Sequence, residues 1–364
     1  MLQRLDILYL KQGGPYTVNR YIFKENQPEC LNHSCWLDKG DPGGMHRTYD
    51  RWPEIAEESY SEEYGQAESG GVSDVVFAGM GGSGAIGDVL YSMLSKTGIH
   101  VSVVKGYVLP RTAGPGTLVV STSISGNTRE TLTVIEAARE AGCQTACFCS
   151  GGEMLEYCTR HKMPHWVVPM HHSPRTSFPS FLYAMLSVLG GVIPVDEKDV
   201  RDSISDMREL RSRISPERED NPALELARWI KGMPVIYYPW GLQAAAVRFK
   251  NSLQENAKCH VIAEDVIEAC HNGIVSWEGG GNAQPILIEG ADDYYKTKER
   301  WAILRGFFES RGIGYREVRS VKGGVLSKII NLVYLLDYAS IYLAVLRGVE
   351  PSPVPAIDYI KRHL

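Results

Sequence analysis

Apolar residues follow two alternating spacings along the chain, and this alternation predicts the fold class. From Val72 onward, short apolar runs typical of buried strands are separated by longer segments whose apolar residues recur at helical spacing. In the first half we expect strands at 72–79, 100–107, 117–123, 144–150 and 165–170. Helices are expected at 45–60, 87–96, 128–142 and 178–192. Such alternation is typical of α/β proteins, in which helices flank a mainly parallel sheet.

The second half repeats this alternation without a clear sequence repeat, so we expect two domains of one architecture. Strands are expected at 234–240, 284–290 and 315–320, and helices at 242–258, 297–312 and 327–347. A strongly charged segment at 197–220 has a helical pattern and connects the halves. The predicted division is 1–44 as an extension of unknown role, 45–195 as the first domain, 196–222 as a helical connector, 223–347 as the second domain and 348–364 as a C-terminal segment.

One segment, residues 329–346, is almost apolar enough to span a membrane. Asp337 lies near its middle, where an aspartate costs about 2.5–3.5 kcal/mol on insertion into a bilayer. We therefore expect a buried core helix and no membrane partner. The run MLQRLDILYL at the start is short and interrupted by charges, so no signal peptide is expected.

Composition narrows the functional classes. The chain has 364 residues, 44% of them apolar, which is enough for two hydrophobic cores. The net charge of −5 and the lack of a polybasic block argue against a nucleic-acid partner. The eight cysteines include no C-x-x-C pair, which favours a reducing, cytoplasmic setting over a zinc site or a disulfide framework. Cys30, His33 and Cys35 are weak ligand candidates, so no metal is expected.

A glycine-rich loop, GMGGSG at residues 79–84, follows the first predicted strand and precedes a helix. The pattern matches the dinucleotide-binding fingerprint G-x-G-x-x-G. That fingerprint also needs an acidic residue at the end of the next strand, where this chain has Lys105. The loop lacks the G-K-[ST] ending of a P-loop as well. The glycines therefore favour close approach of the backbone to a phosphate, and no nicotinamide cofactor is expected.

A second loop, STSISGNT at residues 121–128, places five hydroxyl side chains within eight residues after another strand. Ligands of parallel sheets bind at the carboxyl ends of strands, so we expect this loop to lie beside Ser83 of the first loop. Hydroxyls and helix-start N–H groups can hold a phosphate monoester with little need for Lys or Arg. The alternative is that these residues only cap helices and fill turns.

These loops and two later motifs resemble one known family. GMGGSGAIGD and STSISGNTRETL are similar to the phosphate-binding segments of sugar isomerase (SIS) domains. The segment R-x-K-N-x-L-x-E-N-A-K at 248–258 and a C-terminal P-x-P-V…I-D…K resemble the archaeal-type bifunctional phosphoglucose/phosphomannose isomerases. The resemblance runs from about Met45 to Leu364 and implies two SIS-type domains. It also implies a metal-independent aldose–ketose isomerase that interconverts glucose 6-phosphate and mannose 6-phosphate with fructose 6-phosphate.

The resemblance also implies roles for individual residues. Glu255 would be the base that moves a proton through a cis-enediol, and His271 and Lys361 would open the sugar ring. The family forms homodimers in which this histidine is shared across the interface, and it uses no cofactor. The substrate-binding residues implied are Gly82, Ser83, Ser123, Ser125, Thr128 and Arg175.

Each catalytic candidate also has a purely structural interpretation. Glu255 would then be a surface carboxylate paired with Arg248 or Lys258. His271 would be a packed core histidine, as most histidines among apolar residues are. Lys361 would be a solvated residue near a chain end.

One position of the C-terminal motif departs from the family. Relatives commonly read D-P-T-P, whereas this chain has Glu350, Pro351, Ser352 and Pro353. Serine keeps the hydroxyl of threonine but loses its methyl group. The departure bears on the balance between glucose and mannose substrates, and not on the isomerase chemistry itself.

Other functions share some of these features. A non-catalytic sugar-phosphate-binding regulator would use the same loops, but no DNA-binding segment is visible. An amidotransferase-type isomerase would need a glutaminase domain with an N-terminal cysteine, which the start Met1-Leu2-Gln3 does not offer. A zinc-dependent mannose phosphate isomerase would need a His/Glu ligand cluster. The sequence therefore favours the metal-independent isomerase.

Overall fold

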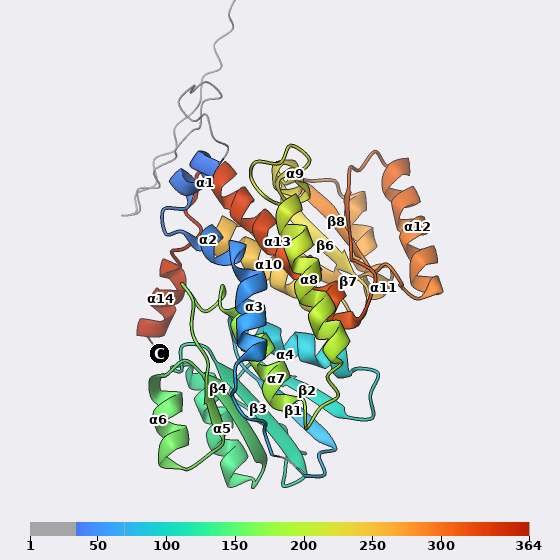
Figure 1. The fold of residues 1–364 in the computed structure, drawn as a ribbon. Helices are drawn as coiled ribbons and strands as arrows, with labels where there is room; N and C mark the ends of the chain where they lie inside the picture. The colour runs from blue at the N-terminus through green and yellow to red at the C-terminus, as the bar shows by residue number, and fades with distance from the viewer. Residues whose placement is uncertain (1–33, 69, 364) are drawn as a thin grey trace, which may run out of the picture.

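The computed structural model describes residues 34–68 and 70–363, which form two parallel sheets flanked by helices (Figure 1). The first sheet has the order β2-β1-β3-β4-β5, and all its pairs are parallel. Its strands are β1 Asp74–Ala78, β2 His100–Val104, β3 Thr117–Ser123, β4 Gln144–Cys149 and β5 His165–Val167. The helices around it are α4 Gly81–Leu94, α5 Arg129–Glu140, α6 Gly152–Arg160 and α7 Phe178–Leu189. Because β1 and β3 are neighbours, the loops that follow them emerge side by side.

The second sheet has the order β7-β6-β8-β9 and is also parallel throughout. Its strands are β6 Met233–Tyr238, β7 Ile262–Asp265, β8 Ala283–Glu289 and β9 Arg316–Arg319. Its associated helices are α10 Gln243–Ala257, α11 Val266–Ala269, the 3-10 helix η1 Gly273–Glu278 and α12 Tyr295–Ser310. The order repeats that of the first four strands, and the predicted fold class is confirmed.

The long helix α13, Val325–Leu346, packs against helices from both halves of the chain (Figure 1). Its neighbours include α10, α8 Glu197–Arg213 and α9 Pro222–Trp229. Among the described helices it is the one with the length and composition of a membrane span, but 89% of its apolar window is buried inside the fold. Asp337 is fully buried there. The prediction of a core helix is confirmed.

The N-terminal helices cover the junction between the two halves. They are α1 Ser34–Gly40, α2 Met45–Asp50 and α3 Trp52–Ser61, and the chain ends with α14 Pro355–Arg362. Ordered packing begins before Met45, because α1 contacts α13 and buries Leu37. Residues 1–33 of the expected extension, including Cys30 and His33, lie outside the described residues.

Candidate active site

Two loops of the first sheet meet at the carboxyl ends of β1 and β3. The Oγ atom of Ser83, in the first turn of α4, accepts a hydrogen bond from the Ile124 N–H at 3.3 Å. Ser123, the last residue of β3, donates through its hydroxyl to Thr128 Oγ1 of the second loop at 2.9 Å. Ser83 and Ser123 are buried, whereas Ser125 and Thr128 are partly exposed. The structure therefore brings the four predicted hydroxyls to one edge of the sheet.

The hydroxyl-rich loop keeps its shape because Gly126 has no side chain. Gly126 has a φ of +75°, and a Cβ there would lie 1.7 Å from the carbonyl oxygen of Gly151. Its own carbonyl accepts from the Met154 N–H at 2.9 Å, and Asn127 Oδ1 accepts from the Glu153 N–H at 3.0 Å. The first turn of α6 thus fixes the loop.

The first glycine loop packs against the segment that carries Arg175. A Cβ on Gly82 would lie 3.3 Å from the Pro174 carbonyl oxygen and 3.4 Å from Arg175 Cα. The small size of Gly82 therefore allows the loop to approach this segment closely. Arg175 precedes α7 and is only 8% exposed.

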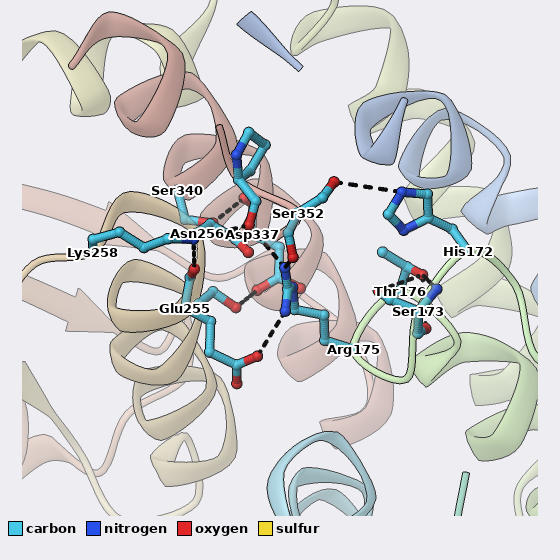
Figure 2. A network of polar contacts seen from close by, with 12 residues as sticks. His172, Ser173, Arg175, Thr176, Glu255, Asn256, Lys258, Asp337, Ser340 and Ser352 are labelled. Atoms are coloured by element: carbon cyan, nitrogen blue, oxygen red, sulfur yellow. Dashed lines mark hydrogen bonds and ion pairs between the residues drawn. The ribbon is translucent and has the colours of Figure 1, made fainter. Parts of the chain in front are cut away.

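The Arg175 guanidinium connects the first half of the chain to the second (Figure 2). Its Nη1 lies 3.0 Å from Glu255 Oε2. Its Nη2 donates to the carbonyls of Pro351 and Ser352 at 2.8 and 2.7 Å. Its Nε is buried and has no hydrogen-bond partner among the described residues. A fixed cation thus faces the predicted base.

Glu255 lies in the last turn of α10, and its side chain is 27% exposed. The negative end of the helix dipole acts on the carboxylate there, and Arg175 compensates its charge. The structural alternative paired Glu255 with Arg248 or Lys258. Arg248 pairs with Asp337 instead. Lys258 Nζ binds the backbone carbonyl of Glu255, whereas the carboxylate pairs with Arg175. Partial exposure leaves the Glu255 carboxylate accessible to a ligand.

Lys258, which follows α10 in a left-handed conformation, enters the sequence prediction only as a possible ion-pair partner of Glu255. Its Nζ donates to the carbonyl of Glu255 and, at 3.2 Å, to that of Pro351. Partial burial and the nearby Arg175 charge lower the pKa of Lys258 to about 8. The carboxylates of Glu255 and Glu350 act in the opposite direction. The one sequence signal was its position three residues after the predicted base.

Behind the ion pair, a buried network fixes the backbone of Arg175. Arg248 Nη2 donates to the Arg175 carbonyl at 2.8 Å and to Asp337 Oδ2 at 2.6 Å. Asp337 also accepts from the hydroxyls of Ser252 at 2.6 Å and Tyr49 at 3.0 Å. The network connects α2, α10 and α13 to the Arg175 segment.

The structure leaves His271 and Lys361 outside this cluster. His271 lies between α11 and η1, Lys361 lies in α14, and both are exposed. Within the described part of the chain, no hydrogen bond or ion pair joins either residue to Glu255. The interpretation of His271 as a packed core histidine is therefore wrong, whereas Lys361 has the exposure of a chain-end residue.

The loop of the second sheet that corresponds to the hydroxyl-rich loop has a different chemistry. From the last residue of β8 onward, residues 289–294 read EGADDY, with three carboxylates and no serine or threonine. The loop offers no serine or threonine donor, and the nearby cations Arg305 and Lys328 are already paired, with Glu289 and Asp292 respectively. The chemistry suited to a phosphate is therefore that of the first sheet.

No group of three or more His, Cys, Asp or Glu side chains in residues 34–68 and 70–363 is arranged to hold a metal ion. The weak candidates Cys30 and His33 lie outside these ranges.

Comparisons with known proteins match both halves of this arrangement. Residues 219–364 match the bacterial phospho-glucose isomerase C-terminal SIS domain. The bifunctional phosphoglucose/phosphomannose isomerase of Caldicellulosiruptor bescii is 31% identical over 306 residues, covering 80% of this chain and 90% of that protein. The protein of the same name from Aquifex aeolicus is 30% identical over 296 residues, with the same coverage of 80% and 90%.

The fold also matches a solved structure. A hypothetical protein of Thermus thermophilus superposes with a TM-score of 0.66 at 16% identity, covering 93% of this chain and 90% of that chain. At this identity the likeness concerns the fold alone. The sequence relatives carry the assignment further, and they show that the chain belongs to the family of bifunctional phosphoglucose/phosphomannose isomerases.

Proposed function

We propose that this protein is an aldose–ketose isomerase that interconverts glucose 6-phosphate and mannose 6-phosphate with fructose 6-phosphate. The observation that carries the proposal is the Glu255 carboxylate held 3.0 Å from Arg175 in a chain with a hydroxyl-rich loop. The names of the two relatives support the substrate class. A non-catalytic sugar-phosphate-binding regulator would have no use for a partly exposed carboxylate facing a fixed cation.

In this proposal each half of the chain has its own task. Glu255 takes the proton from C2 of the open-chain aldose, which gives a cis-enediol, and returns it at C1 to give the ketose. Arg175 stabilises negative charge on the enediolate oxygens. Because the enediol is planar at C2, a proton returned there from either face gives glucose or mannose. The phosphate would be held by the starts of α4 and α5 together with Ser83, Ser123, Ser125 and Thr128.

Ring opening would need the two residues that lie outside the cluster. In the proposal, Lys361 reaches the site from α14 of the same chain. His271 reaches it from the second chain of a homodimer. Exposure of both residues in the single chain supports this assignment. Mixed dimers of Glu255→Gln and His271→Ala chains contain one intact site, so we expect them to recover part of the activity that each variant lacks alone. Mixed dimers as inactive as the two parents would contradict a shared site.

Gly126→Ala tests the phosphate loop. We expect the KM for both hexose phosphates to rise by about tenfold or more, because the added Cβ would meet the Gly151 carbonyl and displace the loop. Gly142→Ala is the matched control, since Gly142 has φ +68° but its Cβ would lie 3.8 Å from Pro115. Steady-state kinetics give the comparison, and equal effects of the two variants would contradict the proposed phosphate site.

The first test of the function is fructose 6-phosphate formation from each aldose phosphate, measured separately and with EDTA present. Turnover of both sugars in EDTA supports one metal-independent isomerase. Turnover of only one would overturn the bifunctional assignment. Binding of hexose phosphates without turnover would favour the regulator.

A further inference from the structure

The lysine that follows α10 has a backbone conformation that lysine rarely adopts. Lys258 has a φ of +52°, and only two other described non-glycine residues, Lys162 and His172, have positive φ. Positive φ is disfavoured for residues with a Cβ, and glycine is the common residue just after a helix. Lys162 has the same φ of +52° just after α6, so this conformation places the Lys258 side chain but does not by itself assign it a function.

The ammonium of Lys258 and the guanidinium of Arg175 bind the same carbonyl (Figure 2). The Pro351 oxygen accepts from Lys258 Nζ at 3.2 Å and from Arg175 Nη2 at 2.8 Å. Arg175 Nη2 also binds the next carbonyl, that of Ser352, at 2.7 Å. We call the two cations and the two carbonyls the tail clamp. It fixes the chain beside Glu255, at the point where the C-terminal segment begins.

The segment beyond the tail clamp has little packing of its own. Residues 355–363 are all exposed, and α14 buries none of its residues. In Figure 1, α14 lies at the edge of the molecule. Prolines at 351, 353 and 355 restrict φ, so the orientation of the chain at the clamp is passed on to α14. The tail clamp is therefore well placed to determine where Lys361 lies.

We propose that Lys258 is a positioning residue of the isomerase, which acts through the tail clamp to place Lys361. This inference rests on the proposed function, which gives Lys361 its role in ring opening. The charges agree with the geometry, because desolvation of the ammonium, and then the nearby Arg175 charge, lower the pKa of Lys258 to about 8.

The position of the tail can be tested without measuring activity. We expect Lys258→Met to speed amide hydrogen exchange at residues 354–363 by about tenfold or more, because α14 then opens more often. Lys258→Gly suits the left-handed backbone, so it should speed exchange without lowering the thermal midpoint. The matched control is Lys162→Met, since Lys162 has the same φ of +52° at an exposed turn after α6. Unchanged exchange in Lys258→Met would overturn the inference. That result is expected, for example, where a second chain rather than the tail clamp holds α14 in place.

Kinetics test the connection to Lys361. We expect Lys258→Met to lower kcat by about tenfold or more with little change in KM, and Lys258→Arg to restore most of the loss. In a Lys361→Ala chain, Lys258→Met should have little further effect, because both changes act on the same step. If Lys258→Met lowers kcat by the same factor in the Lys361→Ala chain as in the unmodified chain, Lys258 does not act through Lys361. Failure of the unmodified protein to convert any hexose phosphate would contradict the proposed function. The hydrogen-exchange measurement would still show whether the tail clamp holds residues 354–363.

Discussion

Glu255→Gln is expected to lower kcat for both aldose phosphates by about 10²–10⁴, with little change in KM. Glutamine has the size of glutamate, and its side-chain oxygen can still accept a hydrogen bond from Arg175, 3.0 Å away in the unmodified protein. Its amide cannot take a proton from carbon. Initial rates of fructose 6-phosphate formation measure the loss of turnover. Incorporation of solvent deuterium into the sugar, followed by NMR, reports the proton transfer itself.

The control for this variant removes a carboxylate from a different ion pair, one that lies at the surface and involves neither Glu255 nor Arg175. Glu54 pairs with Arg211 at 2.7 Å, and both side chains are 36% exposed. Glu54→Gln should change stability only slightly and leave turnover intact, because exposed ion pairs contribute little. A Glu255→Gln protein that incorporates deuterium at the unmodified rate would show that another group is the base.

The elements around the phosphate loops could be predicted because local signals agree there. The strand expected at 117–123 is β3, Thr117–Ser123, since an apolar run ends at a hydroxyl-rich turn and a helical pattern follows. Strand β7, Ile262–Asp265, could not be found this way. It has four residues, two of them acidic, and it pairs with a single neighbour at the edge of the sheet. Its structure comes from β6 rather than from its own pattern.

The site was predictable residue by residue, but its contacts were not. The motifs identified Glu255 and Arg175, yet nothing local shows that residues 80 positions apart form an ion pair. Asp337 argued against a membrane span, and a carboxylate in a buried apolar helix also needs a partner. Periodicity does not identify that partner as Arg248 of another helix. The left-handed φ of Lys258 belongs to the C-cap of α10, where the cap N–H binds the Leu253 carbonyl. The sequence does not mark it, because glycine is the common residue at such a position.

Asp337→Ala is expected to lower the free energy of unfolding by about 3–5 kcal/mol, because it leaves the Arg248 charge buried without a partner. Arg248 is 3% exposed and Asp337 is 0% exposed. Oδ2 of Asp337 accepts from Arg248 Nε at 2.9 Å and from Nη2 at 2.6 Å. Burial, and then the Asp337 charge, raise the pKa of Tyr49 well above its ordinary value, so its hydroxyl is protonated at neutral pH and donates to Asp337. In Asp337→Ala this hydroxyl also loses its acceptor. Equilibrium unfolding in urea measures the loss.

Removing both charges separates the stability of the network from its effect on the site. We expect Arg248→Met combined with Asp337→Leu to recover the stability lost to the unpaired charge, because apolar groups often replace a buried ion pair without cost. The hydroxyls of Tyr49 and Ser252 still lack their acceptor, so recovery should be partial. The kcat of the double variant should be well below that of the unmodified protein. Arg248 binds the Arg175 carbonyl at 2.8 Å, and in the double variant no side chain replaces that donor. A double variant with unmodified kcat would contradict the role of Arg248 in holding Arg175. An Asp337→Ala protein of unchanged stability would contradict the cost of the unpaired charge. Low turnover in a stable double variant would show that the network serves the site by keeping the Arg175 guanidinium opposite Glu255.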